Sequence, residues 1–310
     1  MSGSGWTDQD VPDVSGKRFL VTGANTGLGR ETARVLLAKG GEVVLLCRDR
    51  ARGEAAQKEL REATSEPERV TLELLDLGSL TSIRTFSERE LSASQPIAAL
   101  ICNAGLRAIP ESKTADGFET QMGVNHLGHF ALVGLLLPKL HAARVVAVSS
   151  NYHKMGKLEL MDDLLCERRP YDRWTVYKQS KLANLLFMFE LARRAERHKL
   201  TMVAAGAHPG YAATELQGRG VQLGTPKWEG LGMAIGNALF AQSVEAGAWP
   251  QLRAATDPAA KSGDYYGPSG LLELRGPAIR VEATRAARDE AAAAALWATS
   301  EALTKVSFLD

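Results

Sequence analysis

Tyr177 and Lys181 lie four residues apart at the start of an apolar run, a spacing that places both side chains on one face of a helix. A phenol has an ordinary pKa of about 10, and a nearby cation favours the phenolate. A tyrosine beside a lysine can therefore exchange a proton near neutral pH, as acid–base chemistry at a C–OH or C=O carbon requires. Tyrosine and lysine recur four apart by chance in many helices, so this chemistry depends on what the rest of the chain supplies.

A glycine-rich turn precedes the first expected helix. Residues 22–29 read Thr-Gly-Ala-Asn-Thr-Gly-Leu-Gly and follow the first expected strand directly. Glycines allow a tight turn and let the main chain approach a pyrophosphate, and the start of the helix offers free N–H groups. Such turns also occur without a ligand, but the strand, turn and helix context here favours a dinucleotide site. The residues expected to contact the cofactor are Gly23, Asn25, Thr26, Gly27, Leu28 and Gly29.

The second expected strand ends in Cys47-Arg48-Asp49. An acidic residue at such a strand end hydrogen-bonds the ribose of NAD, whereas an arginine accommodates the additional phosphate of NADP. Because Arg48 precedes Asp49, the sequence favours NADP(H) over NAD(H). The alternative interpretation of Arg48 is a solvated loop charge.

Two further strand ends carry residues suited to a flat ligand. Asp76 and Leu77 follow the third strand, where the carboxylate can accept from an adenine amino group or cap the next helix. Asn103-Ala104-Gly105 ends the fourth strand, and its small residues let the main chain pass close to a ligand, although the same tripeptide also forms turns. All five residues are therefore expected in the cofactor site.

Short apolar runs alternate with helical segments along most of the chain. The runs are continuous rather than alternating, as expected for strands covered by helices on both faces of a sheet. Repeated β-α units predict an α/β fold: a single-domain, Rossmann-type, doubly wound parallel sheet. Strands are expected at 17–22, 42–47, 70–75, 97–103, 144–149 and 201–207, and helices at 28–38, 51–63, 79–91, 117–137 and around Tyr177.

The two ends of the chain differ from this pattern. A polar lead covers residues 1–14, residues 218–228 are glycine-rich and irregular, and residues 228–256 are mostly helical. We expect a last edge strand at 263–267 and an alanine-rich helix at 280–303. Ligands bind beyond the carboxyl ends of such strands, so segments 151–176 and 218–256 are expected to shape a substrate pocket. No composition break divides the chain, which favours one domain over residues 1–310.

Composition excludes several classes of protein. The 310 residues include 37 basic and 36 acidic side chains without a long block of one sign, which argues against a nucleic-acid partner. Three widely spaced cysteines fit a reducing compartment. No apolar stretch reaches the roughly 18–20 residues of an integral membrane segment, and the start lacks the apolar core of a signal peptide. We therefore expect a cytoplasmic protein.

Taken together, these motifs resemble the short-chain dehydrogenase/reductase family, in the family's order over about residues 17–216. Within it, residues 125–130 and 177–184 look most like the retinol dehydrogenase-like branch, which includes relatives of light-dependent protochlorophyllide reductase. The matching pieces are residues 22–29, Asp76, Asn103-Ala104-Gly105, Asn125, Ser150, Tyr177-x-x-x-Lys181 and Pro209-Gly210…Thr214.

The resemblance implies a role for each matching residue. Tyr177 would be the general acid or base, and Lys181 would lower its pKa and hold the nicotinamide ribose. Ser150 would hydrogen-bond the substrate oxygen, with Ser149 structural, and Asn125 would hold a water that links Lys181 to solvent. The residues that would orient the nicotinamide carboxamide are Pro209, Gly210, Tyr211 and Thr214.

Residues 151–176 separate Ser150 from Tyr177, a longer insert than in compact family members but similar to the retinol dehydrogenase-like branch. Its apolar residues can line the pocket or pack ordinarily, and those of interest are Met155, Leu164, Leu165 and Trp174. His126 and His129 lie three apart without a third ligand, so they indicate helix packing and no metal site is expected.

The expected function is an NADP(H)-dependent oxidoreductase that interconverts a small hydrophobic alcohol and its aldehyde or ketone. One alternative is NADPH-dependent reduction of a C=C bond, as in the protochlorophyllide reductase relatives. Another is a non-catalytic NADP-binding sensor or scaffold, which intact Ser150, Tyr177 and Lys181 disfavour. An apolar stripe beside Tyr177 is expected mainly in the core, and the resemblance implies that it can also serve a homo-oligomer interface; its residues are Leu182, Leu185, Leu186 and Phe189.

Overall fold

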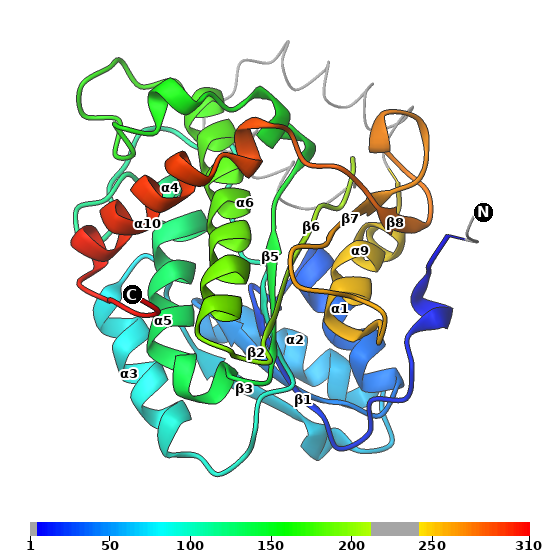
Figure 1. Cartoon of the computed structure of the whole chain (residues 1–310). Helices are drawn as coiled ribbons and strands as arrows, with labels where there is room; N and C mark the ends of the chain where they lie inside the picture. Colours follow the sequence, from blue (N-terminus) through cyan, green and yellow to red (C-terminus); the bar gives the residue numbers. More distant parts are fainter. Residues whose placement is uncertain (1–4, 212–241) are drawn as a thin grey trace.

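Within residues 5–211 and 242–310, which a computed structural model describes, eight strands form one sheet (Figure 1). They are β1 (Arg18–Thr22), β2 (Glu42–Cys47), β3 (Val70–Leu74), β4 (Ala99–Cys102), β5 (Arg144–Val148), β6 (Val203–Ala207), β7 (Tyr265–Pro268) and β8 (Ala278–Arg280). Their order across the sheet is β3-β2-β1-β4-β5-β6-β7-β8. All neighbours are parallel except β7 and β8. The predicted single-domain α/β sheet is confirmed.

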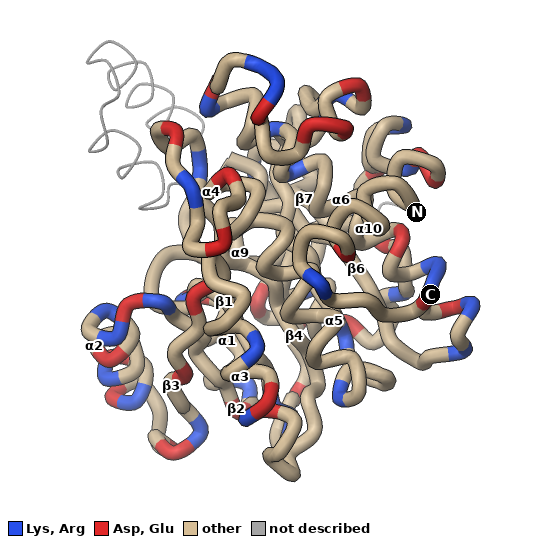
Figure 2. Tube along the Cα trace, turned by 90° about the vertical axis from the view of Figure 1, so that its left-hand side faces the viewer, with Lys and Arg blue, Asp and Glu red and all other residues tan. Residues whose placement is uncertain are grey.

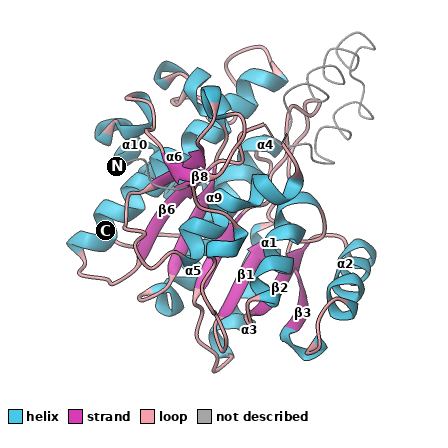
Figure 3. Cartoon of the chain, turned by 90° about the vertical axis from the view of Figure 1, so that its right-hand side faces the viewer, coloured by secondary structure: helices cyan, strands magenta, loops and turns pink. Residues whose placement is uncertain are grey.

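Helices cover both faces of this sheet (Figure 3). They are α1 (Gly27–Ala38), α2 (Arg50–Glu62), α3 (Leu80–Ser92), α4 (Thr120–Met122), α5 (Gly128–Leu140), α6 (Arg173–Arg197), α9 (Val244–Thr256) and α10 (Glu290–Thr304). Successive residues of a strand point to opposite faces, so Val43 and Leu45 pack in the core under α1 and α9, whereas Val44 and Leu46 pack in the core under α3 and α5. Helices α1, α2 and α9 form one layer, and α3, α5 and α6 form the other, with α10 against α6.

The carboxyl-terminal part differs from the sequence expectation. The helix expected at 280–303 begins only at Glu290, because Asp289 caps it by accepting from Ala292 N at 2.8 Å. Residues 278–280 instead form β8, which pairs antiparallel with β7. The strand expected at 263–267 is therefore β7, and the expectation that it is the edge strand is wrong, since β8 lies beyond it. Alanine-rich composition hid both the strand and the helix start.

The helix expected at 117–137 is also interrupted. A π-helical turn over residues 123–127 joins α4 to α5. Such turns widen a helix by one residue and occur often at functional sites. This one places Asn125 opposite the chain that leaves β4, where its side chain bonds the main chain of Leu106.

The polar lead packs against the far edge of the sheet. Trp6 and Ala278 exchange two main-chain hydrogen bonds of 3.0 and 2.8 Å, and the Trp6 side chain is buried. Basic and acidic residues are interspersed over the rest of the described chain (Figure 2). None of the described helices is both long and apolar enough to cross a membrane.

Candidate active site

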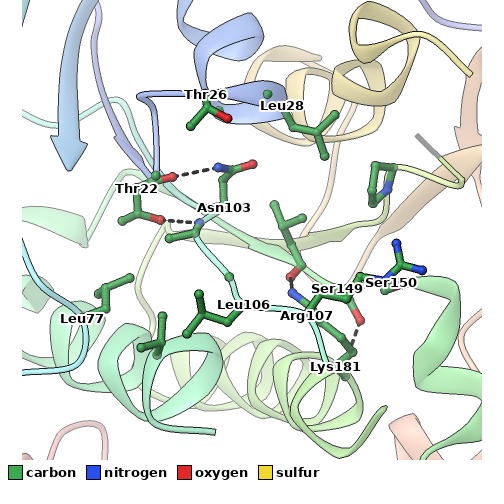
Figure 4. A pocket seen from close by; sticks show the side chains of 18 of the residues that line it. Thr22, Thr26, Leu28, Leu77, Asn103, Leu106, Arg107, Ser149, Ser150 and Lys181 are labelled. Carbon is green, nitrogen blue, oxygen red and sulfur yellow. Dashed lines mark hydrogen bonds between the residues drawn. The ribbon is translucent and has the colours of Figure 1, made fainter. Parts of the chain in front are cut away.

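A cavity lies at the carboxyl ends of the strands, where β1 and β4 are neighbours and the order of connections reverses. Its lining runs from the glycine-rich turn at one end to Ser150 and Lys181 at the other (Figure 4). Asn125 is not part of the lining, and Thr214 lies outside the described residues. The sequence-predicted residues that do line the cavity are Gly23, Asn25, Thr26, Gly27, Leu28, Gly29, Arg48, Asp76, Leu77, Asn103, Ala104, Gly105, Ser150, Tyr177, Lys181, Pro209, Gly210 and Tyr211.

The start of α1 is open toward this cavity. Thr26 is the N-cap residue, but its side chain makes no capping hydrogen bond. The first N–H groups of α1 therefore stay available to an anion, and the helix dipole favours negative charge there. Gly29 is packed so closely that a Cβ on it would lie 2.5 Å from both Asn103 Nδ2 and Gly23 O. A side chain at this position would displace the turn.

The end of β4 is bonded firmly to β1. Asn103 Nδ2 donates to Thr22 O at 2.8 Å, and Ala104 N donates to Thr22 Oγ1 at 2.9 Å. Gly105 lies between two polar groups, since a Cβ on it would be 3.3 Å from Asn125 Oδ1 and 3.4 Å from Lys181 Nζ. The Asn103 amide thus fixes the end of β4 against β1, and the tripeptide lines the cavity.

Acidic residues beside the cavity have local partners. Asp49 caps α2 by accepting from Arg52 N at 3.0 Å and does not line the cavity, whereas the exposed Arg48 does. Asp76 Oδ1 accepts from Gly78 N at 2.9 Å. The helix cap considered for Asp76 is instead provided by Ser79, whose Oγ accepts from Ser82 N.

Asn125 is fully buried and uses its whole amide. Oδ1 accepts from Leu106 N at 2.6 Å, while Nδ2 donates to Leu106 O and to Ser180 Oγ at 2.9 Å each. The side chain therefore connects the loop after β4 to α6. The nearby His129 bonds Thr22 Oγ1 and Asn125 O, and burial lowers its pKa to about 4, consistent with the packing role expected for it.

Two adjacent serines at the end of β5 have different surroundings. Ser149 Oγ is buried and donates to Lys181 O at 2.7 Å, so it fastens β5 to α6. Ser150 lines the cavity, where its hydroxyl accepts a long bond of 3.3 Å from Tyr152 N and also interacts with the Tyr177 side chain. Its carbonyl accepts from His153 Nδ1 at 2.7 Å, which fixes the main chain. Of the two hydroxyls, the one at Ser150 acts on Tyr177, and its role toward a substrate stays a prediction.

Tyr177 and Lys181 lie on the same face of α6, and the Lys181 Nζ is 5.9 Å from the centre of the Tyr177 ring. Burial lowers the pKa of Lys181 to about 8, and Nζ donates to Val148 O at 3.2 Å. Burial also raises the pKa of Tyr177, and the charge of Arg107 and the Ser150 side chain act in the opposite direction. Arg107 is thus a second cation that favours the phenolate of Tyr177, and the effect of Lys181 on this pKa stays a prediction.

Comparisons with known proteins agree with this arrangement. A model of the short chain dehydrogenase family matches residues 17–161. Human retinol dehydrogenase 13 is 41% identical over 297 residues, which cover 94% of this chain and 85% of that protein. The chain belongs to the short-chain dehydrogenase family. It is therefore an oxidoreductase, and enzymes of this family use NAD or NADP.

One further relative and two solved structures are also similar to this short-chain dehydrogenase. Human retinol dehydrogenase 12 is 48% identical over 206 residues, which span 66% of this chain and 64% of that protein. A solved structure of an uncharacterized protein from Mycobacterium paratuberculosis is 39% identical with a TM-score of 0.81, covering 98% of this chain and 99% of that one. A short chain dehydrogenase from Shigella flexneri complexed with NADP shares the fold, at 22% identity, a TM-score of 0.62, and 83% and 98% coverage.

Some residues that line the cavity of this short-chain dehydrogenase were not indicated by the sequence pattern. Arg107 had an available signal, since it is a charged residue two positions after the Asn103-Ala104-Gly105 strand end. Tyr152 follows Ser150 by two positions at the start of the insert. The lining residues of this kind are Leu46, Leu75, Leu106, Arg107, Val124, Val148 and Tyr152.

The two segments expected to shape the pocket contribute less to its described lining than anticipated. Of the insert, Tyr152 lines the cavity, while Met155 is 57% exposed and Leu164 packs into the core. Of the later segment, residues 218–241 lie outside the described residues, and α9 packs on α1. Gln251 on α9 helps to position the lining residue Asn103, since its Nε2 donates to Asn103 Oδ1 at 3.3 Å.

Proposed function

We propose that this protein is an NADP(H)-dependent oxidoreductase that interconverts a hydrophobic alcohol and its aldehyde or ketone. The observation that carries the proposal is the meeting of Ser150, Tyr177 and Lys181 at one end of a cavity whose other end is the open start of α1. A phenol, a hydroxyl and an ammonium group are suited to proton transfer at a single oxygen atom.

The residues at the glycine-rich end fit a dinucleotide. The start of α1 would hold the pyrophosphate, and Asp76 with the main chain of residues 103–105 would flank the adenosine and the ribose. Arg48 supports NADP(H), because it lines the cavity while the carboxylate of its neighbour Asp49 is occupied by the α2 cap. The bound nicotinamide would supply or accept the hydride.

The other end of the cavity would bind the reacting group. For reduction, the Ser150 hydroxyl would hydrogen-bond the carbonyl oxygen, and Tyr177 would donate its proton to the same oxygen. Because burial raises the pKa of Tyr177, the phenol is protonated at neutral pH and suited to this step. For oxidation the proton returns to Tyr177. Lys181, cationic below its pKa of about 8, would stabilise the phenolate and hold the nicotinamide ribose.

The apolar lining and the names of the relatives bear on the substrate class. Leu106, Val124 and Tyr152 give the cavity an apolar wall, and human relatives bear the name retinol dehydrogenase, which favours a hydrophobic alcohol or carbonyl. The water assigned to Asn125 and the carboxamide contacts of residues 209–211 and Thr214 come from the family resemblance. For Asn125, the contacts with Leu106 support a positioning role as well.

A panel of aldehydes and ketones, followed by the loss of NADPH absorbance, tests this function. We expect turnover of apolar carbonyl compounds and the corresponding alcohol as product. Product analysis separates C=O from C=C reduction, and formation of a saturated carbonyl compound would favour the alternative enzyme. Tight NADPH binding without turnover of any panel member would favour a sensor or scaffold.

A further inference from the structure

Arg107 lies against an aromatic pair at the reacting end of the cavity. Its guanidinium carbon is 5.4 Å from the ring centre of Tyr152 and 5.2 Å from that of Trp174. These two rings stack on each other at 5.6 Å, and each also contacts the ring of Tyr177 edge-on. Cation–π contacts of this kind orient a guanidinium group without neutralising its charge. Arg107 is thus held in place with its charge still available.

No carboxylate among the described residues lies within ion-pair distance of Arg107, and its Nε is buried without a hydrogen-bond partner. Two other partly buried arginines differ in this respect. Arg18 pairs with Glu90 at both carboxylate oxygens, and Arg194 pairs with Glu190 at 2.8 Å. Removing a guanidinium charge from bulk water costs free energy unless a nearby anion pairs with it. An anionic group on a ligand would therefore supply the partner that the described residues do not give Arg107.

The position of Arg107 indicates which ligand. Figure 4 places it beside Ser149, Ser150 and Lys181, across the cavity from Thr26 and Leu28 at the start of α1. The cofactor pyrophosphate belongs at the start of α1, and its additional phosphate belongs near Arg48. Arg107 instead lies near enough to Tyr177 for its charge to act on that phenol. An anion on Arg107 would belong to the molecule whose carbonyl group meets Tyr177.

We propose that Arg107 determines specificity by binding a carboxylate group of the substrate, which makes the preferred substrates oxo-acids or hydroxy-acids with an apolar body. The inference rests on the proposed function, since it names the substrate class of the same site. The planar fork of arginine matches a carboxylate with two parallel hydrogen bonds. Tyr152 and Trp174 would orient that fork, and Leu106 would contact the apolar body.

Matched acids and esters test the proposal. We would measure kcat and KM for para-formylbenzoate and a straight-chain ω-oxo fatty acid, each beside its methyl ester, with NADPH. Wild type is expected to prefer the acids, and Arg107→Gln to reduce the acid-to-ester ratio of kcat/KM by roughly 10- to 100-fold, mainly through KM, as loss of a charge-assisted hydrogen bond implies. Arg107→Lys should retain part of the preference.

Arg168→Gln is the matched control, because Arg168 lies in the same insert as Tyr152, is 64% exposed and pairs with Asp162. It should leave the acid-to-ester ratio unchanged. An unchanged ratio in Arg107→Gln would overturn the proposal. An equal loss of kcat for acid and ester with a shifted pH profile would also overturn it, since Arg107 would then act on the proton transfer of Tyr177 alone.

Failure of the proposed function has a different signature. If wild type reduces neither acid nor ester, the binding of both to the NADPH-loaded protein can be followed by tryptophan fluorescence, because Trp174 stacks on Tyr152. Tighter binding of the acid in wild type, lost in Arg107→Gln, would support the carboxylate site without turnover. Equal binding of acid and ester would overturn it. Thermal unfolding of each variant shows that the fold is retained.

Discussion

The two ends of the cavity are built in different ways. The glycine-rich end consists mainly of main chain from consecutive residues, 22–29 and 103–105, packed so closely that Gly29 has no room for a Cβ. The reacting end consists of side chains from β5, the insert, α6 and the loop after β4. There, burial shifts the pKa values of Tyr177 and Lys181 in opposite directions. The first end depends on shape, and the second depends on charges held out of water.

This difference predicts that cofactor binding and proton transfer can be changed separately by substitutions at the two ends. At the reacting end, Tyr177→Phe should change turnover while the cofactor still binds, and Lys181→Met should change the pH dependence of stability. Substitutions at the glycine-rich end should weaken cofactor binding.

The largest effect is expected for Tyr177→Phe. Removing the hydroxyl eliminates the proton donor and should lower kcat roughly 10²- to 10⁴-fold, the usual contribution of a positioned acid. The Kd for NADPH, measured by fluorescence titration, should stay within about threefold of wild type. Tyr171→Phe is the control, because the Tyr171 hydroxyl donates to Ile109 O and does not line the cavity. Near-wild-type turnover by Tyr177→Phe would contradict the assignment.

The second effect concerns Gly29→Ala. The new methyl group would overlap Asn103 Nδ2 and Gly23 O, each 2.5 Å from its position. We expect a loss of about 1–3 kcal/mol in the free energy of unfolding and weaker NADPH binding. Urea unfolding and cofactor titration measure the two. Gly16→Ala adds a methyl group with nothing within 4 Å but strains a backbone at φ +70°, so it should cost stability alone. Unchanged cofactor affinity in Gly29→Ala would contradict the close-packed turn.

The third effect concerns the free energy of unfolding of Lys181→Met. The folded-state pKa of Lys181 is about 8 against an ordinary value of 10.5, so burying the ammonium group destabilises wild type fully below pH 8. That penalty is relieved as pH rises from 8 toward 10.5, because the folded state loses its proton first. Lys181→Met should therefore be more stable than wild type at neutral pH by roughly 1–3 kcal/mol, with a smaller difference at higher pH. Urea unfolding across this pH range measures the difference in free energy of unfolding between variant and wild type. A difference that did not change with pH would contradict the lowered pKa of Lys181.

The smallest effect is expected for Arg48→Ala. Loss of one exposed phosphate contact should weaken NADPH binding by about tenfold and change NADH binding little. Paired titrations with both cofactors measure the ratio. Lys58→Ala on α2 is a suitable control, since its side chain is 78% exposed and outside the cavity lining. A wild-type preference for NADH would remove the basis for assigning this role to Arg48.

The same difference explains what the sequence could predict. The strands up to β6 and the glycine-rich turn depend on neighbouring residues, so local pattern was sufficient to find them. The role of Arg107 depends on Tyr152 and Trp174, which come from a separate segment and meet it only in the folded chain. Helical spacing predicted that Lys181 and Tyr177 share a face, but could not show that Nζ bonds Val148 O. The start of α10 was missed because helix propensity is nearly uniform along an alanine-rich run.

The two hydrogen bonds between Trp6 and Ala278 have a further consequence. Strand β8 lies at the end of the sheet, where an unpaired strand offers its main-chain groups as a template for another molecule. Trp6 occupies part of that edge and blocks intermolecular strand addition there. Removing the lead would leave the oxidoreductase chemistry in place and make the protein prone to self-association through β8.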